Sequence, residues 1–259
     1  MYSFQNNQLI LDKWAKRAHI RKEGEISPDG VYYKGSRYHF ESNGKIFCER
    51  ERGDEDALWN NSLRRILFIS KDSNESNNPY DMRCCELTHN PDGSLSFGCR
   101  FVNNMLRLTA GLASLSKMGF ITFDEINKID YLDEIWEKTA VARINVKKHS
   151  GGPSISSKAL SSAIEAYSDY IIEQILLLNA NIIVCCGGSS IIKNFVVNNI
   201  YNDAERINNW IYYSPIQNTW IIDSYHLQPR SATTDEALYT NIMSNFCNAL
   251  KKKNLEPVI

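Results

Sequence analysis

The chain has 259 residues, of which 29 are Lys or Arg and 30 are Asp or Glu, so its formal net charge at pH 7 is −1. With 43% hydrophobic and 23% charged residues, the composition is that of a globular protein and excludes a disordered or collagen-like chain. A net charge near zero argues against a protein that coats nucleic acid over its whole surface, but it allows a local basic groove.

Membrane insertion and a disulfide framework are also excluded. No apolar run approaches the ~18 residues of a membrane span, and residues 1–19 are charged and lack a signal-peptide core. We therefore expect a cytoplasmic protein. The seven cysteines include two adjacent pairs, Cys84–Cys85 and Cys185–Cys186, which is typical of reduced thiols. Their spacing fits neither zinc nor an iron–sulfur cluster, so we expect no metal and no cofactor.

The first 60 residues are predicted to form an extension that packs on a main domain of residues 61–259. A helix is predicted over Asn7–His19. Its apolar residues at helical spacing are Leu9, Leu11, Trp14 and Ala15. A polar, aromatic-rich stretch with several glycines follows, which indicates short strands or an ordered wrap around the domain.

From residue 64 onward, short apolar runs alternate with longer helical segments. The runs are Ile66–Ser70, Ala140–Val146, Ile182–Cys186 and Trp220–Ser224. Helices are predicted at 101–117, 158–178, 189–199 and 234–252. This alternation predicts a three-layer α/β/α fold with a central four-stranded parallel sheet. Right-handed crossovers place the carboxyl ends of all four strands at one edge, where ligands of such folds bind.

The loop after the first strand contains Asp72. A carboxylate at the mouth of a parallel sheet can orient a water molecule or face a developing positive charge. The alternative is a helix N-cap or an Asx-turn, which is what Asp often provides after a strand.

The loop after the second strand is basic and ends in glycines. Lys147 and Lys148 suit a phosphate, and the amide of Asn145 can donate to and accept from a base edge. The alternative is a solvated turn with a structural Asn.

The loop after the third strand reads Gly187-Gly188-Ser189-Ser190 and opens a helix, so it could hold an anion. It has neither the spacing nor the Lys of a P-loop, and it lacks the dinucleotide-binding pattern of glycines. The alternative is a plain strand-to-helix turn.

The loop after the fourth strand contains His226, Arg230 and Ser231. The His could donate a hydrogen bond to charge that accumulates on a leaving group, and the other two could reach a phosphate. The alternative is a structural histidine.

Together the four loops resemble those of the uracil-DNA glycosylase superfamily, over roughly residues 64–252. The segment from His226 to Ala232 is similar to its His-Pro-Ser-Pro-Leu-Ser-Ala motif and agrees at His226, Pro229, Ser231 and Ala232. The first loop keeps only the Asp of Gly-Gln-Asp-Pro. Asn145-Val146-Lys147-Lys148 is similar to an Asn-Val-Val-Lys segment, and the third strand ends in a similar Gly-Ser phosphate loop.

The resemblance implies a monofunctional DNA glycosylase that hydrolyses the N-glycosidic bond of a flipped-out base and leaves an abasic site. Asp72 would orient the water and stabilise the sugar cation, His226 would bind the departing base, and Asn145 would read its edge. The implied phosphate contacts are Lys147, Lys148, Gly188, Ser189, Ser190 and Ser231. The chemistry of the reaction agrees with these roles. Departure of the base leaves an oxocarbenium-like sugar, which a carboxylate stabilises, and an anionic ring, which a hydrogen-bond donor stabilises.

The same resemblance implies which residues form the base pocket and which side chain, the wedge, fills the gap that the flipped base leaves in the DNA. Phe97 or Tyr80 would stack on the base, and Arg230 would fill the gap it leaves. The other expected base contacts are Lys71, Ser73 and Asn74. Ser73-Asn74 replaces a Pro-Tyr pair whose Tyr excludes the methyl group of thymine. A wider pocket for a uracil-like or modified pyrimidine follows, with a role in DNA repair or in defence against phage DNA with modified bases.

Two other functions remain open: a non-catalytic nucleotide- or DNA-binding module of the same fold, and a nucleoside hydrolase. The glycosylase interpretation requires that Asp72 and His226 converge on one cavity. It also implies DNA as the partner, no contact with a membrane, and a monomer.

Overall fold

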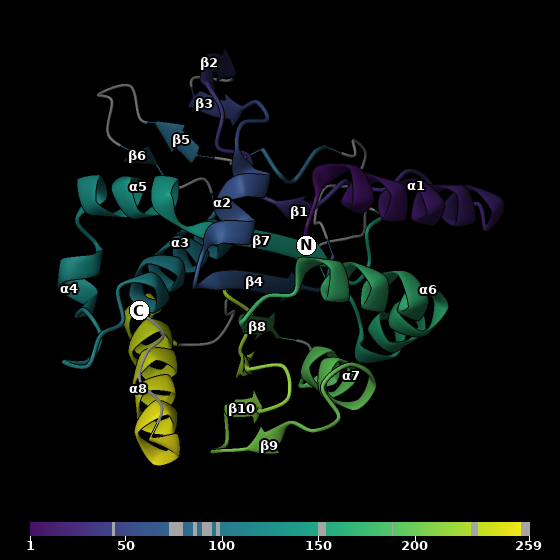
Figure 1. Cartoon of the computed structure of the whole chain (residues 1–259). Helices are drawn as coiled ribbons and strands as arrows, with labels where there is room; N and C mark the ends of the chain where they lie inside the picture. The colour runs from purple at the N-terminus through teal and green to yellow at the C-terminus, as the bar shows by residue number, and fades with distance from the viewer. Residues whose placement is uncertain are drawn as a thin grey trace.

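The main sheet places four strands in parallel at its centre (Figure 1). The computed structural model describes residues 1–42, 45–72, 80–84, 87–89, 95–96, 99–149, 154–187, 189–228 and 233–254. In these residues the sheet has seven strands in the order β1-β7-β4-β8-β11-β10-β9. Their bounds are β1 Gly30–Val31, β4 Arg65–Ser70, β7 Ala140–Asn145, β8 Ile182–Cys186, β9 Glu205–Arg206, β10 Ile211–Ser214 and β11 Thr219–Ser224. The parallel strands β7, β4, β8 and β11 are the four predicted apolar runs, so the predicted α/β class is confirmed.

The prediction of a purely parallel, four-stranded sheet is wrong. β1 pairs antiparallel with β7 at one edge, and β10 and β9 add antiparallel strands at the other. β1 and β9 have two residues each, which is too short for a recognisable apolar run. β10 joins β11 in a hairpin whose turn holds Asn218 at φ 48°, a conformation that Asn tolerates.

Helices cover both faces of the sheet. Their bounds are α1 Phe4–Ile20, α2 Glu55–Asn61, α3 Arg100–Ala113, α4 Phe123–Ile126, α5 Ile129–Lys138, α6 Ser157–Leu178, α7 Ile191–Asn199 and α8 Asp235–Lys253. The core on one face contains side chains of α3, α4, α5 and α8, and the core on the other contains those of α1, α2, α6 and α7. β4 serves both: Ile66 and Phe68 point to the first core, Leu67 and Ile69 to the second. This alternation follows from the pleat of a strand that is buried on both faces.

The N-terminal residues are built into the main body. α1 packs on α6, where the ring of Trp14 stacks on that of Tyr167 at 5.0 Å between centroids. A second sheet of β2 (Arg37–Ser42), β3 (Lys45–Arg50), β5 (Leu87–His89) and β6 (Leu95–Ser96) pairs strands from both sides of residue 60. Backbone hydrogen bonds therefore cross the predicted domain boundary.

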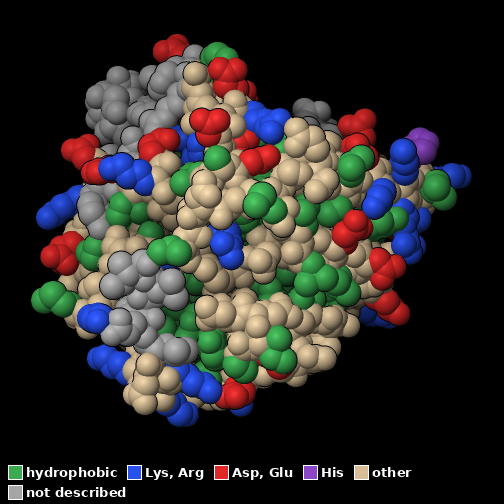
Figure 2. Space-filling view, viewed as in Figure 1, with side chains coloured by type: hydrophobic (Ala, Val, Ile, Leu, Met, Phe, Trp, Pro, Cys, Tyr) green, Lys and Arg blue, Asp and Glu red, His purple; other side chains and the backbone are tan. Residues whose placement is uncertain are grey.

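Charges of both signs are distributed over the surface. Figure 2 shows basic and acidic side chains interspersed on one face of the molecule, in keeping with the net charge of −1. A polyanion would therefore have to bind through a local group of cations. None of the helices in the described part of the chain combines the length and the apolar character that a membrane span requires.

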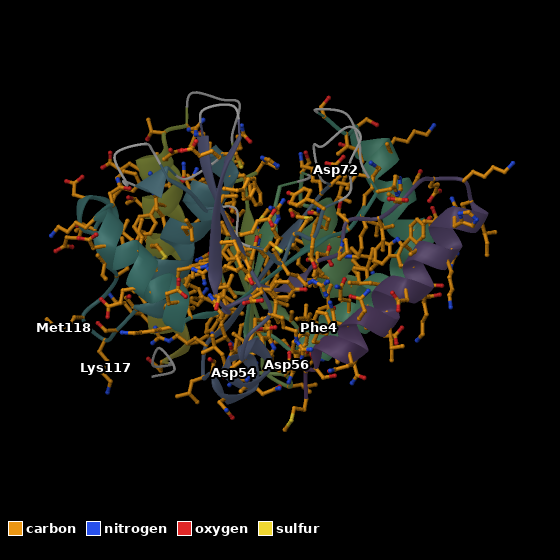
Figure 3. The ribbon with its side chains drawn as sticks, turned by 90° about the horizontal axis from the view of Figure 1, so that it is seen from above. Phe4, Asp54, Asp56, Asp72, Lys117 and Met118 are labelled. Carbon is orange, nitrogen blue, oxygen red and sulfur yellow. The ribbon has the colours of Figure 1, made fainter. Side chains whose placement is uncertain are left out.

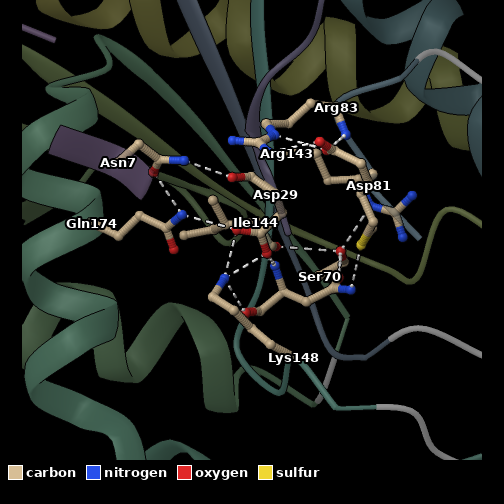
Figure 4. A network of polar contacts seen from close by, with 11 residues as sticks. Asn7, Asp29, Ser70, Asp81, Arg83, Arg143, Ile144, Lys148 and Gln174 are labelled. Atoms are coloured by element: carbon tan, nitrogen blue, oxygen red, sulfur yellow. Dashed lines mark hydrogen bonds and ion pairs between the residues drawn. The ribbon is translucent and has the colours of Figure 1, made fainter. Parts of the chain in front are cut away.

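A buried ion pair joins the N-terminal residues to the loop after β7 (Figure 4). The ammonium group of Lys148 lies 2.7 Å from Asp29 Oδ1, and both side chains are fully buried. The Gln174 amide donates to the same oxygen at 2.9 Å, and Asn7 donates to the Asp29 carbonyl at 2.8 Å. The predicted contact of Lys148 with a DNA phosphate is therefore wrong, because its charge is enclosed and already neutralised.

Breaking this pair is expected to destabilise the fold. Lys148→Met should lower the free energy of unfolding by about 3–5 kcal/mol, because it leaves Asp29 buried and without its cation. Urea denaturation followed by circular dichroism measures the change. The control Lys13→Met, which removes an exposed ion pair with Glu173 (3.2 Å), should cost no more than about 1 kcal/mol.

The double variant Asp29→Asn/Lys148→Met should be more stable than Lys148→Met alone, since no unpaired charge remains buried. Equal losses for Lys148→Met and Lys13→Met would contradict the assignment.

Candidate functional site

The carboxyl ends of the four parallel strands lie side by side. Their last residues, Ser70, Asn145, Cys186 and Ser224, define what we call the carboxyl edge. Ser70 is in register with Asn145, and Ser224 with Cys186. Figure 3 shows Asp72, which follows β4, on the opposite side of the molecule from Asp54 and Asp56, which precede it. The prediction that the carboxyl ends of the four parallel strands lie at one common edge is confirmed.

The chain leaves neighbouring parallel strands toward opposite faces of the sheet. β4 and β11 lead to α3 and α8 on one face, whereas β7 and β8 lead to α6 and α7 on the other. In the order β7-β4-β8-β11, the face to which the chain runs after each strand therefore alternates from one strand to its neighbour. Such a change opens a crevice between the strand ends, which is where open α/β sheets bind ligands. Two cavities of the described residues lie at such places, between β7 and β4 and between β8 and β11.

The first cavity, which we call the Asp72 cavity, has a volume of about 440 Å³. Its charged or aromatic lining residues are Arg21, Glu23, Asp72, Lys147, His149 and Tyr167. Ser154, Ser156 and Ser162 add hydroxyl groups from the start of α6 and the residues before it. The loops after β4 and β7 are tied together by a hydrogen bond of 2.9 Å from the Lys147 amide to the Lys71 carbonyl, which brings Asp72 and Lys147 to one wall.

Asp72 is a desolvated carboxylate held next to a cation. Its Oδ2 lies 3.6 Å from the Lys147 ammonium group, and only 7% of its side chain is exposed. Burial raises the pKa of Asp72 above its ordinary value, although Lys147 and Lys71 oppose the shift. A carboxylate in this setting can take a proton from water, or face a positive charge with little screening by solvent.

His149 is an imidazole in the same cavity. Its Nδ1 is enclosed and has no hydrogen-bond partner among the described residues. Burial and the nearby Lys147 lower the pKa of His149, which keeps the ring neutral at pH 7. A neutral imidazole carries one N–H donor and one acceptor.

The N-terminal segment and α6 supply the other charged and aromatic residues of the cavity lining. Glu23 accepts from the Tyr167 hydroxyl and pairs with Arg21 at 2.7 Å. Tyr167 has non-helical φ and ψ (−129°, 17°) at a kink in α6. None of these residues, nor His149, is a predicted site residue. The sequence signal for His149 is its place in the basic loop after the second strand, whereas nothing in the sequence connects residues 21–23 to that loop.

The second cavity, which we call the Tyr225 cavity, has a volume of about 430 Å³. It is lined by Gly187, Ser189, Ser190, Asn209, Trp210, Asp223, Ser224, Tyr225 and His226. The His226 ring packs 5.4 Å from the ring of Phe101, and its Nδ1 lies 3.2 Å from the Gln228 amide. Asp72 and His226 therefore line different cavities. The expectation that they converge on a single cavity is not met by the described residues.

Asn145 and Tyr80 lie away from both cavities. Asn145 is 1% exposed, and its side chain is held by the Ser70 hydroxyl and by Met82, whose sulfur accepts from Nδ2 at 3.1 Å. Tyr80 lines a smaller space that it shares with Met82 and Arg143. The predicted base contact of Asn145 is replaced here by hydrogen bonds that fix the end of β7.

The remaining predicted residues are Lys71, two serines of the Tyr225 cavity and a group in the undescribed part of the chain. Ser189 and Ser190 lie in the Tyr225 cavity with φ of 51° and 64°, and Ser190 Oγ donates to Asp223 at 2.6 Å. Lys71 is half-buried beside Asp72. The following predicted residues lie outside the described residues: Ser73, Asn74, Phe97, Gly188, Arg230 and Ser231. In the described residues no group of three or more His, Cys, Asp or Glu side chains is arranged to hold a metal ion.

Lys147 contributes to the pKa values of both neighbours in the Asp72 cavity, in addition to the larger effect of burial. Its cation stabilises the Asp72 carboxylate and opposes a charge on His149, so it lowers the pKa of each group. Lys147→Met should therefore raise both pKa values. Titrations followed by NMR measure the two shifts, with the exposed Lys138→Met as the control. Unchanged titration of His149 would contradict the arrangement.

Comparison of the sequence with family models and curated proteins identifies no relative. The sequence matches no model of a known protein family. No curated protein is significantly similar to it in sequence. The candidate site is therefore defined by its own residues and geometry.

Proposed function

We propose that the protein is a monofunctional DNA glycosylase that hydrolyses the N-glycosidic bond of a flipped-out, uracil-like or modified pyrimidine in the Asp72 cavity. The observation that carries this proposal is a desolvated carboxylate beside a cation, in a cavity at the carboxyl edge of an α/β sheet. Release of a base creates positive charge on the sugar, and a carboxylate in a dry cleft stabilises that charge. Repair of DNA and defence against phage DNA with modified bases both use this reaction.

The dimensions and lining of the cavity suit a nucleobase. Ligand sites in proteins have volumes of about 300–1,000 Å³, and the Asp72 cavity of about 440 Å³ is in this range. Serine hydroxyls in α6 and in the residues before it offer donors and acceptors to the edge of a base. Flipping a nucleotide out of the stack costs a few kcal/mol. Lys71 and Lys147, at the carboxyl edge, can offset part of this cost by attracting phosphates.

The reaction assigns a distinct task to each group. Asp72 accepts a proton from the water whose oxygen bonds to the sugar carbon. The bond from that carbon to the base breaks, and its electron pair stays on the base, which leaves as an anion. A hydrogen-bond donor must face that anion. We assign this donor to His149 in place of His226, because His149 is the imidazole that shares the cavity with Asp72.

Asp72→Asn is expected to lower base release by at least about 100-fold, since the amide cannot accept the proton of water. The substrates are DNAs that carry uracil, mismatched thymine or 5-substituted cytosine. Alkaline cleavage at abasic sites and chromatography of the released base measure the rate.

Asp12→Asn, on the exposed face of α1, is the matched control and should retain full activity. Release of bases from free nucleosides, with a rate indifferent to salt, would indicate a nucleoside hydrolase instead. Binding of DNA without release from any of these substrates would indicate the non-catalytic module.

The two histidines are expected to differ in their effect on the chemical step. His149→Gln should lower the single-turnover rate at saturating DNA by about 100-fold, whereas His226→Gln should change it by no more than a few-fold. Saturating DNA separates the rate of base release from the strength of binding. The reverse order of the two effects would assign the leaving group to His226 and reject the Asp72 cavity as the place of reaction.

A further inference from the structure

The Tyr225 cavity contains an exposed aromatic platform that the proposed reaction does not use. The rings of Tyr225 and Trp210 meet edge to face, 5.0 Å apart at 87°, and 57% of Tyr225 is exposed. An aromatic face that is open to solvent and held by a neighbouring ring is suited to stack on a planar ligand. Little conformational entropy is lost on binding, because the platform is already ordered.

Backbone and side-chain hydrogen bonds fix this platform on the sheet. The Trp210 carbonyl accepts from the Asp223 amide of β11 at 2.7 Å, and the Trp210 amide donates to Asn208 Oδ1 at 2.9 Å. Asp223 is in turn held by the Ser190 hydroxyl at 2.6 Å. The platform thus rests on a strand and two turns that are tied to each other, which is the rigid support that a binding site needs.

The polar lining favours a nucleobase over a phosphate. Asp223 places a carboxylate in the cavity, which repels an anion but accepts hydrogen bonds from the N–H groups of a base. The exposed Asn209 adds an amide beside the rings, and amides can serve either type of base edge.

The two cavities lie on one path along the carboxyl edge. Asp72 follows β4 and Tyr225 follows β11, with only β8 between these strands. Two inter-strand spacings of about 4.8 Å separate the strand ends by about 10 Å. This distance corresponds to about three nucleotides at the 3.4 Å rise of a stacked DNA strand.

We infer that the Tyr225 cavity binds an unpaired base of the same DNA strand, a few nucleotides from the base in the Asp72 cavity. This inference rests on the proposed function, because it takes the Asp72 cavity as the target site. A base in an intact duplex is already stacked on its neighbours, so occupation of the Tyr225 cavity gives a preference for single-stranded or unpaired DNA. Stacking on Tyr225 also makes the identity of the flanking base matter.

The experiment measures binding of single-stranded DNA by fluorescence anisotropy, with the Asp72→Asn protein, in which base release is expected to be slow. Tyr225→Ala in this background should weaken binding about tenfold, and Tyr225→Phe should leave it within twofold, because a phenyl ring still stacks. Tyr38→Ala, which removes an equally exposed Tyr from the second sheet, is the control and should have no effect.

A second measurement changes the DNA and compares the effect in the Asp72→Asn protein with and without Tyr225→Ala. Single bases of the oligonucleotide are replaced in turn by an abasic spacer, and one position near the target should lose affinity about tenfold. The same spacer should cause no further loss of DNA affinity in the Tyr225→Ala protein, because the missing base and the missing ring belong to one contact. Equal affinities of Tyr225→Ala and its parent, or spacer effects that are the same in both, would overturn the inference.

The two proposals fail separately. If the wild-type protein releases no base but its binding depends on Tyr225 and on one spacer position, the cavity remains a single-strand site and the glycosylase proposal falls. If base release depends on Asp72 but DNA affinity does not depend on Tyr225, the glycosylase proposal stands and the single-strand site in the Tyr225 cavity is rejected.

Discussion

The buried ion pair between Lys148 and Asp29 is the interaction on which the candidate site depends. Burying two charges costs free energy. Hydrogen bonds to the Asp29 carboxylate from the Gln174 side chain and from the backbone N–H of Asn145 offset part of that cost. The pair fixes the loop after β7 from inside, so that Lys147 and His149 on either side of Lys148 are held at the wall of the Asp72 cavity. The N-terminal segment is therefore part of the site, both through Asp29 and through Arg21 and Glu23.

The same loop shows why its residues could not be assigned from the sequence. Lys147, Lys148 and His149 look like a solvated basic turn. In the structure the chain bends at Val146 and Lys147, and the residues that follow pair with the N-terminal segment through a hydrogen bond of 2.9 Å from the Ser27 amide to the Lys148 carbonyl and a β-bridge between Ile26 and His149. The Lys147 and His149 side chains line the cavity, whereas the Lys148 side chain between them is fully buried. The partner that makes burial of Lys148 possible is 119 residues away in the sequence.

Other features could be predicted because they depend on local pattern alone. A strand buried on both faces is apolar at most of its positions, so the runs that became β4, β7, β8 and β11 were visible as nearly continuous stretches. The common carboxyl edge then followed from the handedness of crossovers. The edge strands β1 and β9 carry no such pattern, because two residues give no periodicity.

The order of the strands, which no local pattern contains, explains the separation of Asp72 from His226. A common edge places both residues at one end of the sheet, but the crevices at that edge form between strands whose chains leave to opposite faces. In the order β7-β4-β8-β11 this happens at each step, so the edge has more than one crevice. Asp72 belongs to the crevice next to β7, and His226 to the one between β8 and β11. Under the proposed function, a DNA strand that lies along the edge can contact both crevices at once, whereas a single small ligand cannot.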